Sequence, residues 1–209
     1  MSWSPGVTPD DVEAFGRCMQ VHGVALFPAD TVYGLACDPD APEAVDRLYR
    51  LKGRRLGKPA AVMFFDPELA LEALPELGER TRAVLLALLP DALTVLLPNP
   101  AARFPLACGS DPAALGLRVP RLEGELAPLA DVRWPVLQSS ANRAGGPDAR
   151  RVEEVPRDIR RGVDLVLDAG ELPGTPSTVI DLRSYEAHGS WSVVREGAVA
   201  ATDLAGRLD

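Results

Sequence analysis

The sequence predicts an α/β fold in which a mixed sheet is flanked by helices, and three observations support this prediction. Short apolar runs typical of buried strands alternate along the chain with amphipathic stretches of helical period. The chain has 209 residues, of which 46% are apolar and 25% charged, which is enough to form one large hydrophobic core. No internal repeat, low-complexity tract or linker divides it, so we expect a single domain over residues 1–209.

The first half of the chain is expected to hold most of the helices. Asp10 or Asp11 can cap the first helix, which runs to about His22 and places Phe15 and Met19 on one apolar stripe. Further helices are expected at residues 41–52, 67–74 and 79–89, with a short one near 152–155.

Apolar runs that stop at proline or at polar residues are expected to form the strands of the sheet. They lie at residues 23–28, 60–65, 93–98, 115–120, 134–140, 163–170, 177–182 and 191–197. The Thr-Val-Tyr-Gly stretch at residues 31–34 is expected to be a turn, and residues 140–151 a loop rich in Gly, Pro and Arg. Strands interspersed with helices in this way indicate a mixed sheet.

The composition excludes several classes of function. A net charge of −8 argues against a surface that grips nucleic acid throughout, although it leaves room for a local cationic pocket. Three scattered cysteines and two histidines do not indicate a disulfide framework, a structural zinc site or a Ser-His-Asp triad. The N-terminal segment has no secretory pattern, and no apolar run reaches membrane-spanning length. We therefore expect a cytoplasmic protein that does not associate with a membrane.

A run of cations follows the helix expected at residues 41–52. Five basic residues and no acid lie within residues 50–58, in a chain that is acidic overall. One interpretation is a solvated helix end, because cations there complement the helix dipole. The other is an anion site, in which Lys52, Arg54 and Lys58 hold phosphates through side chains, since a helix C-terminus presents carbonyls. The spacing of a Walker A loop is absent.

Other polar candidates follow or interrupt apolar strands, where open α/β sheets bind ligands. Ser140 and Asn142 can donate to a phosphate or ribose, or simply cap a turn. Arg118 and Arg195 lie within apolar strands, so each needs an anionic partner, either a ligand or an internal Asp or Glu. Hydroxyls and arginines without a histidine or metal cluster favour a nucleotide-polyphosphate pocket that works by positioning and charge neutralisation.

Six motifs, in chain order, resemble those of the YrdC-like family, which comprises threonylcarbamoyl-AMP synthases of the TsaC, YrdC and YciO type. They are PADTVYGLACD at 28–38, LKGRRLGKP at 51–59, GLRVP at 116–120, SSAN at 139–142, TPSTVIDL at 175–182 and VVREGAV at 193–199. Six motifs in the right order are far more specific than any one of them. The resemblance runs from about Val24 to Val199 and implies a twisted mixed sheet around a concave basic cavity.

The resemblance also implies an activity. ATP, L-threonine and bicarbonate or CO₂ would give threonylcarbamoyl-AMP and pyrophosphate, with Mg²⁺ accompanying ATP and no protein metal ligand identified. The product would pass to the tRNA threonylcarbamoyl transferase complex, and weak RNA binding is a further possibility. The implied catalytic residues are Lys52 and Arg54, the implied nucleotide-binding residues are these two with Lys58, Ser140, Asn142 and Arg195, and the implied substrate-binding residues are Thr31, Arg118, Ser177 and Thr178.

Three departures from the family pattern keep alternatives open. Ala29 replaces a threonine, Pro90-Asp91-Ala92 replaces a Pro-Gly-Pro turn, and Ala144 replaces a serine. One alternative is a YrdC-like paralogue that adenylates another carbamate. The other is a non-catalytic RNA-binding protein that uses the same cavity.

Overall fold

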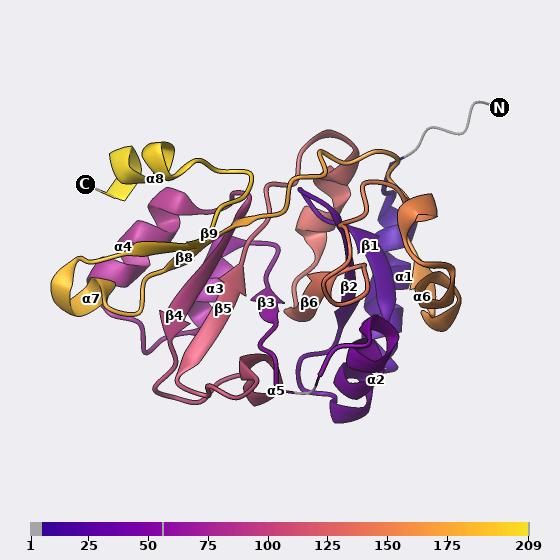
Figure 1. Ribbon diagram of the computed structural model, residues 1–209, viewed down its shortest axis with the longest axis horizontal. Helices are drawn as coiled ribbons and strands as arrows, with labels where there is room; N and C mark the ends of the chain where they lie inside the picture. Colours follow the sequence, from indigo (N-terminus) through magenta and orange to yellow (C-terminus); the bar gives the residue numbers. More distant parts are fainter. Residues whose placement is uncertain (1–5, 56, 209) are drawn as a thin grey trace.

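The computed structural model describes residues 6–55 and 57–208, which contain nine strands. These are β1 Ala25–Pro28, β2 Tyr33–Cys37, β3 Ala61–Met63, β4 Leu93–Pro98, β5 Ala114–Arg118, β6 Val136–Ser140, β7 Leu165–Val166, β8 Thr178–Asp181 and β9 Ser192–Arg195. They form one sheet in the order β7-β1-β2-β6-β3-β5-β4-β8-β9 (Figure 1). Parallel pairs such as β3–β5 occur beside antiparallel pairs such as β2–β6, which confirms the predicted α/β fold with a mixed sheet.

Helices cover both ends of the sheet. They are α1 Pro9–Gln20, α2 Pro42–Lys52, α3 Pro67–Ala73, α4 Glu79–Leu88, α5 Pro105–Cys108, α6 Arg157–Gly162, α7 Tyr185–His188 and α8 Ala201–Leu208, with 3₁₀ turns η1 Gly124–Asp131 and η2 Val152–Glu154. Figure 1 shows α1, α2 and α6 beside the end that contains β1 and β2, and α4, α7 and α8 beside the end that contains β4, β8 and β9. Within the described ranges, no helix has the length and apolarity needed to cross a bilayer.

The first helix is capped two residues before Asp10, the first of its two expected caps. Thr8 is the capping residue: its hydroxyl accepts the Asp11 backbone N–H at 3.2 Å, and the Asp11 carboxylate accepts the Thr8 N–H at 2.9 Å. The prediction that Asp10 or Asp11 caps the helix was therefore wrong, because Asp11 is the third residue of a reciprocal capping box.

The predicted turn at residues 31–34 is partly a strand, so that prediction was wrong in its second half. The chain turns at residues 30–32 and enters β2 at Tyr33, which pairs with both β1 and β6. The Tyr-Gly pair suggested a turn, but Gly34 lies in a strand where the Gln138 side chain packs closely against it. A Cβ at Gly34 would lie 2.7 Å from the Gln138 side-chain nitrogen. The turn at residues 30–32 and the end of β6 at Ser140 consequently lie close together.

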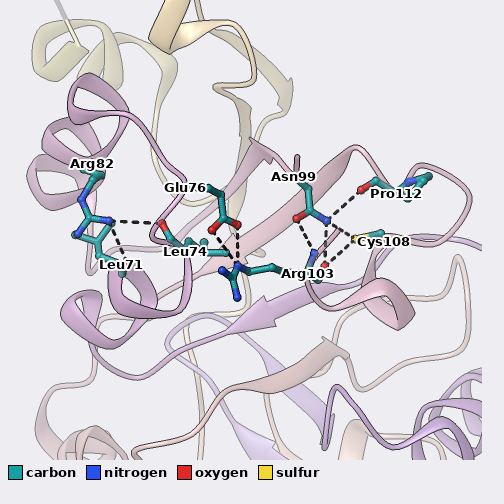
Figure 2. Close-up of polar contacts among 8 residues, drawn as sticks. All are labelled: Leu71, Leu74, Glu76, Arg82, Asn99, Arg103, Cys108 and Pro112. Carbon is teal, nitrogen blue, oxygen red and sulfur yellow. Dashed lines mark hydrogen bonds and ion pairs between the residues drawn. The ribbon is translucent and has the colours of Figure 1, made fainter. Parts of the chain in front are cut away.

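The segment between β4 and β5 is held by one buried side chain, Asn99. Its amide nitrogen donates to the carbonyls of Arg103 and Pro112 at 3.0 Å each, and its oxygen accepts the Arg103 N–H at 2.9 Å. Figure 2 shows this cluster beside the Arg103–Glu76 ion pair, whose atoms are 2.8 Å apart. The fixed segment carries α5, and the Ala107 carbonyl there accepts the Ala60 N–H, so the residues before β3 are anchored as well.

Candidate functional site

A cavity lies over the middle of the sheet and is lined by segments that are far apart in sequence. Its polar lining consists of three arginines, five hydroxyls, one amide and one carboxylate: Arg54, Arg118, Arg195, Thr31, Thr94, Ser139, Ser140, Ser177, Gln138 and Asp148. The structure thus brings together six predicted site residues: Thr31, Arg54, Arg118, Ser140, Ser177 and Arg195. The other four, Lys52, Lys58, Asn142 and Thr178, lie outside the lining.

Arg118 lies at the end of β5 and forms a buried ion pair with Asp30. Its Nη2 lies 2.5 Å from Asp30 Oδ1, and the two side chains are only 4% and 5% exposed. Nη2 also donates to the Thr31 hydroxyl at 3.2 Å. Burial lowers the pKa of the Arg118 guanidinium and raises the pKa of Asp30, and the attraction between the two charges opposes both shifts. The internal acid that the sequence left as one option is therefore present.

Arg195 lies at the end of the edge strand β9 and is exposed. Its Nη2 donates to the Ser177 carbonyl at 2.7 Å and lies 3.3 Å from the Ser177 hydroxyl. That hydroxyl is 2.9 Å from the Thr94 hydroxyl, so β4, β8 and β9 are linked at this wall. Among the described residues no carboxylate lies within ion-pairing distance of Arg195, and its positive charge faces the cavity uncompensated.

Arg54 enters the cavity from the segment after α2. Its Nη1 donates to the Ser139 hydroxyl at 3.0 Å, Nη2 donates to the Pro59 carbonyl, and the guanidinium lies 5.5 Å from the centre of the Tyr49 ring. The Nε atoms of Arg54 and Arg118 are both buried and have no hydrogen-bond partner within residues 6–55 and 57–208. A buried N–H without a partner is costly, so a ligand with acceptor oxygens suits both arginines.

Lys52 is buried behind the cavity wall, although it belongs to the predicted anion site. Its ammonium donates to the Ser140 carbonyl, to the Asn142 carbonyl at 3.0 Å and to the Asn142 side-chain oxygen at 2.9 Å. Burial first, and then the charge of Arg54, lower the pKa of the Lys52 ammonium to about 8. Asn142 in turn donates to Asp148 Oδ1 at 3.0 Å. Lys52 and Asn142 thus fix the position of the loop that lines the cavity.

Lys58 and Thr178 also make their contacts away from the lining. The Lys58 carbonyl accepts the Tyr49 hydroxyl at 2.7 Å, and the Lys58 residue is exposed. Thr178 is fully buried, and its hydroxyl donates to the Val199 carbonyl at 2.6 Å. Ser177 and Thr178 were predicted as a pair, but adjacent residues of a strand point to opposite faces, so only Ser177 lines the cavity.

Sequence reasoning missed Thr94, Gln138 and Asp148. Thr94 gave a usable signal, because it is the one polar residue in the strand Leu93–Pro98. Gln138 is part of the apolar-to-polar transition in β6, and Asp148 lies in a Gly/Pro-rich loop whose path the sequence could not give.

The cavity can bind oxyanions without a protein-held metal. No group of three or more His, Cys, Asp or Glu side chains within the described ranges could hold a metal ion. Guanidinium forks and hydroxyls are the donors that match phosphate or carboxylate oxygens.

Comparison with known proteins agrees with this arrangement. The family model for Sua5, YciO and YrdC proteins, described as "Telomere recombination", matches residues 17–197. The threonylcarbamoyl-AMP synthase of Stenotrophomonas maltophilia is 35% identical over 164 residues, which cover 75% of this chain and 84% of that protein. The one of Bacillus subtilis is 30% identical over 165 residues, which cover 78% of this chain. The chain spans about half of the Bacillus protein, at 47% of its length.

Solved structures show the same fold. The structure titled P. abyssi Sua5 complexed with L-threonine superposes with a TM-score of 0.81 at 25% identity, over 96% of this chain and 58% of that one. E. coli YciO superposes with a TM-score of 0.77 at 23% identity, over 94% of both chains. The YrdC-like fold predicted from the motifs is therefore confirmed.

Proposed function

Because the chain belongs to the Sua5/YciO/YrdC family, we propose that it is a nucleotidyltransferase that converts ATP, L-threonine and bicarbonate or CO₂ into threonylcarbamoyl-AMP and pyrophosphate. The observation that carries this proposal is the cavity with three arginines, two of which keep a buried Nε–H without a partner in the described chain. Threonylcarbamoyl-AMP synthases are among the relatives at about 30% identity.

The proposed chemistry needs positioning and charge neutralisation. The threonine amine takes up CO₂ with loss of a proton, a carbamate oxygen attacks the α-phosphorus, and the bond to the leaving pyrophosphate breaks. Arg54 and Arg195 have no carboxylate partner in the described chain, so they would neutralise the polyphosphate. The hydroxyls of Ser139 and Ser140 line the wall beside Arg54 and would orient the α-phosphate or ribose.

The amino acid is proposed to lie on the Arg118 side, where Thr31 adds a hydroxyl, and to reach the Ser177 hydroxyl at the Arg195 wall. Ala29, which replaces a threonine of the family pattern, is fully buried and lies outside the lining. Its missing hydroxyl therefore leaves the cavity wall unchanged, and recognition would rest on Thr31 and Ser177.

The remaining predicted residues are proposed to act indirectly. Lys52 and Asn142 would hold Ser140 and Asp148 in place, and Thr178 would support Ser177 by its contact with Val199. The exposed Lys58 would add long-range attraction for an anionic substrate at the rim. Mg²⁺ would enter bound to ATP, and the product would serve tRNA threonylcarbamoylation by partner proteins.

A second candidate is a paralogue that adenylates another carbamate. It is favoured by the altered turn at Asp91. Asp91 here forms an ion pair with Arg207 of α8, in which Oδ2 lies 2.7 Å from Nη1. A glycine at this position could not make that contact.

Pyrophosphate release, measured with ATP, bicarbonate and threonine, serine or valine in turn, tests the proposal. We expect release that depends on threonine, together with threonylcarbamoyl-AMP identified by mass spectrometry. Arg54→Met should abolish most of it, whereas Arg133→Met removes an arginine outside the lining and should leave it unchanged. Release that depends on another amino acid, and not on threonine, would support the paralogue instead.

A further inference from the structure

Asp30 lies next to the cavity but is not part of its lining, and both of its carboxylate oxygens are occupied. Oδ1 accepts Nη2 of Arg118 at 2.5 Å, and Oδ2 accepts the backbone N–H of Arg121 at 3.2 Å. The backbone contact comes from the segment that directly follows β5, so the strand that carries Arg118 also fixes its acid partner. A carboxylate held at both oxygens defines one position for the guanidinium.

The donors of Arg118 are distributed unevenly as a result. Nη2 is taken by Asp30 and Thr31, and Nη1 makes only a long 3.5 Å contact to the Gln138 side-chain oxygen. Nε has no partner among the described residues. Asp30 therefore holds one end of the guanidinium, and the described residues leave hydrogen-bonding capacity at Nη1 and Nε unfilled.

We infer that Asp30 is a positioning residue, which orients Arg118 so that its remaining N–H groups meet the amino-acid substrate. The effect of Asp30 on kcat rests on the proposed function, whereas its effect on the orientation of Arg118 does not. This positioning role also accounts for a pair that stability alone explains poorly, because a buried ion pair typically contributes little compared with an apolar pair of similar volume.

A carboxylate with the same two kinds of contact, but 41% exposed where Asp30 is 5% exposed, serves as the control. Asp164 also bridges an arginine and a backbone N–H, lying 2.6 Å from Arg47 and 2.8 Å from the Val24 nitrogen. Neither Asp164 nor these partners line the cavity. Loss of such a bridge should lower stability in both Asp30→Asn and Asp164→Asn, and by more in Asp30→Asn because that pair is buried, whereas an effect on the site should appear in Asp30→Asn alone.

The effect on the orientation of Arg118 is tested by NMR of the arginine Nε–H groups, with the Arg118 signal identified by its loss in Arg118→Lys. In wild type this buried N–H should exchange slowly with solvent. In Asp30→Asn it should exchange on the order of tenfold faster or more, and in Asp164→Asn it should stay slow, because local opening governs exchange. Unchanged exchange in a folded Asp30→Asn protein would overturn the inference, whatever reaction the protein catalyses.

The effect on kcat is measured with Asp30→Glu. This variant keeps the negative charge beside Arg118, so it can be measured even where Asp30→Asn does not fold. The extra methylene should displace the guanidinium, so kcat for pyrophosphate release at saturating ATP should fall by roughly tenfold to a hundredfold, the scale for a misplaced group. Asp164→Glu should retain the wild-type kcat. Wild-type kcat and KM for threonine in Asp30→Glu would overturn the positioning role, whereas a wild type without threonine-dependent release would instead refute the proposed function.

Discussion

The inner strand β5 and the edge strand β9 each end in an arginine. The two arginines differ in their exposure to solvent and in whether a carboxylate pairs with them. Arg118 on β5 is 4% exposed and paired with an acid, because strands lie on both sides of it. Arg195 on β9 is exposed, and among the described residues its side chain hydrogen-bonds to Ser177 alone. Their sequence contexts, GLRVP and VVREG, had given the same expectation for both, namely that an arginine in an apolar strand needs an anionic partner, either a ligand or an internal acid.

The difference shows how a position in the sheet decides what an arginine can do. An inner strand removes water from the guanidinium, so a carboxylate has to compensate the charge before any ligand arrives. An edge strand leaves the guanidinium hydrated, and its charge stays available. The cavity therefore combines a prearranged hydrogen-bond donor at Arg118 with an uncompensated cation at Arg195.

The largest effect that we expect concerns stability. Arg118→Met leaves the Asp30 charge buried and unpaired, so the free energy of unfolding should fall by about 3–5 kcal/mol. Arg195→Met should lower it by at most about 1.5 kcal/mol, the scale of one hydrogen bond, because the residue is exposed and contacts Ser177 without an ion pair. Urea unfolding of both variants checks this, and the Asp30→Asn/Arg118→Met double variant should regain part of the loss. Equal losses in the two single variants would remove the distinction between the strands.

Sequence patterns were sufficient for most strands, because runs that end at proline or polar residues mark them clearly. They were also sufficient to select the arginines, since an arginine in an apolar run needs an anion. The Arg118–Asp30 pair was out of reach, because its members are 88 residues apart and meet only through the order of the strands.

The burial of Lys52 could have been predicted. Val45, Leu48 and Tyr49 form the buried stripe of α2, and Lys52 follows Leu48 by four positions and Tyr49 by three. Helical spacing thus places Lys52 on the inner face. Its interpretation as a direct phosphate contact was based on the run of cations and on the resemblance to the family motif, whereas the periodicity of the helix indicated the inner face.

A second effect is a pH dependence of stability that comes from Lys52. This cation is buried, whereas Arg195 is exposed. Its folded-state pKa is about 8, below the ordinary lysine value of about 10.4, so between these values the unfolded chain binds more protons. The stability contributed at this site should therefore rise with pH above 8, while below pH 8 the full cost of the buried charge is present. Relative to Lys52→Met, wild type should gain at most about 1.4 kcal/mol per pH unit.

Urea unfolding at pH 7.5, 8.5 and 9.5 measures this difference. Lys58→Met is the matched control, because it removes an exposed lysine from the same segment. A wild-type minus Lys52→Met difference that does not change with pH would show that the ammonium is not confined as the structure has it.

The smallest expected effect is at Ser177, the residue that supports Arg195. Ser177→Ala removes the hydroxyl that lies between Arg195 and Thr94, but the Ser177 carbonyl still accepts from Arg195. Unfolding free energy should fall by about 0.5–1.5 kcal/mol, the scale of one hydrogen bond. ATP affinity, measured by calorimetry, should change by less than about threefold, or under 0.7 kcal/mol. A larger loss of affinity would mean that the hydroxyl itself binds the nucleotide.

Calorimetric titration of Mg²⁺-ATP into wild type and Arg195→Met tests the central claim most directly, namely that the uncompensated arginine of the edge strand binds the polyphosphate. Arg195→Met should weaken binding by roughly 1.5–3 kcal/mol, the scale of a hydrogen bond to a charged group, which is about 10-fold to 150-fold in Kd. The control Arg133→Met, which removes an arginine paired with Asp66 outside the lining, should bind like wild type. Equal ATP affinity in wild type and a folded Arg195→Met protein would contradict the account.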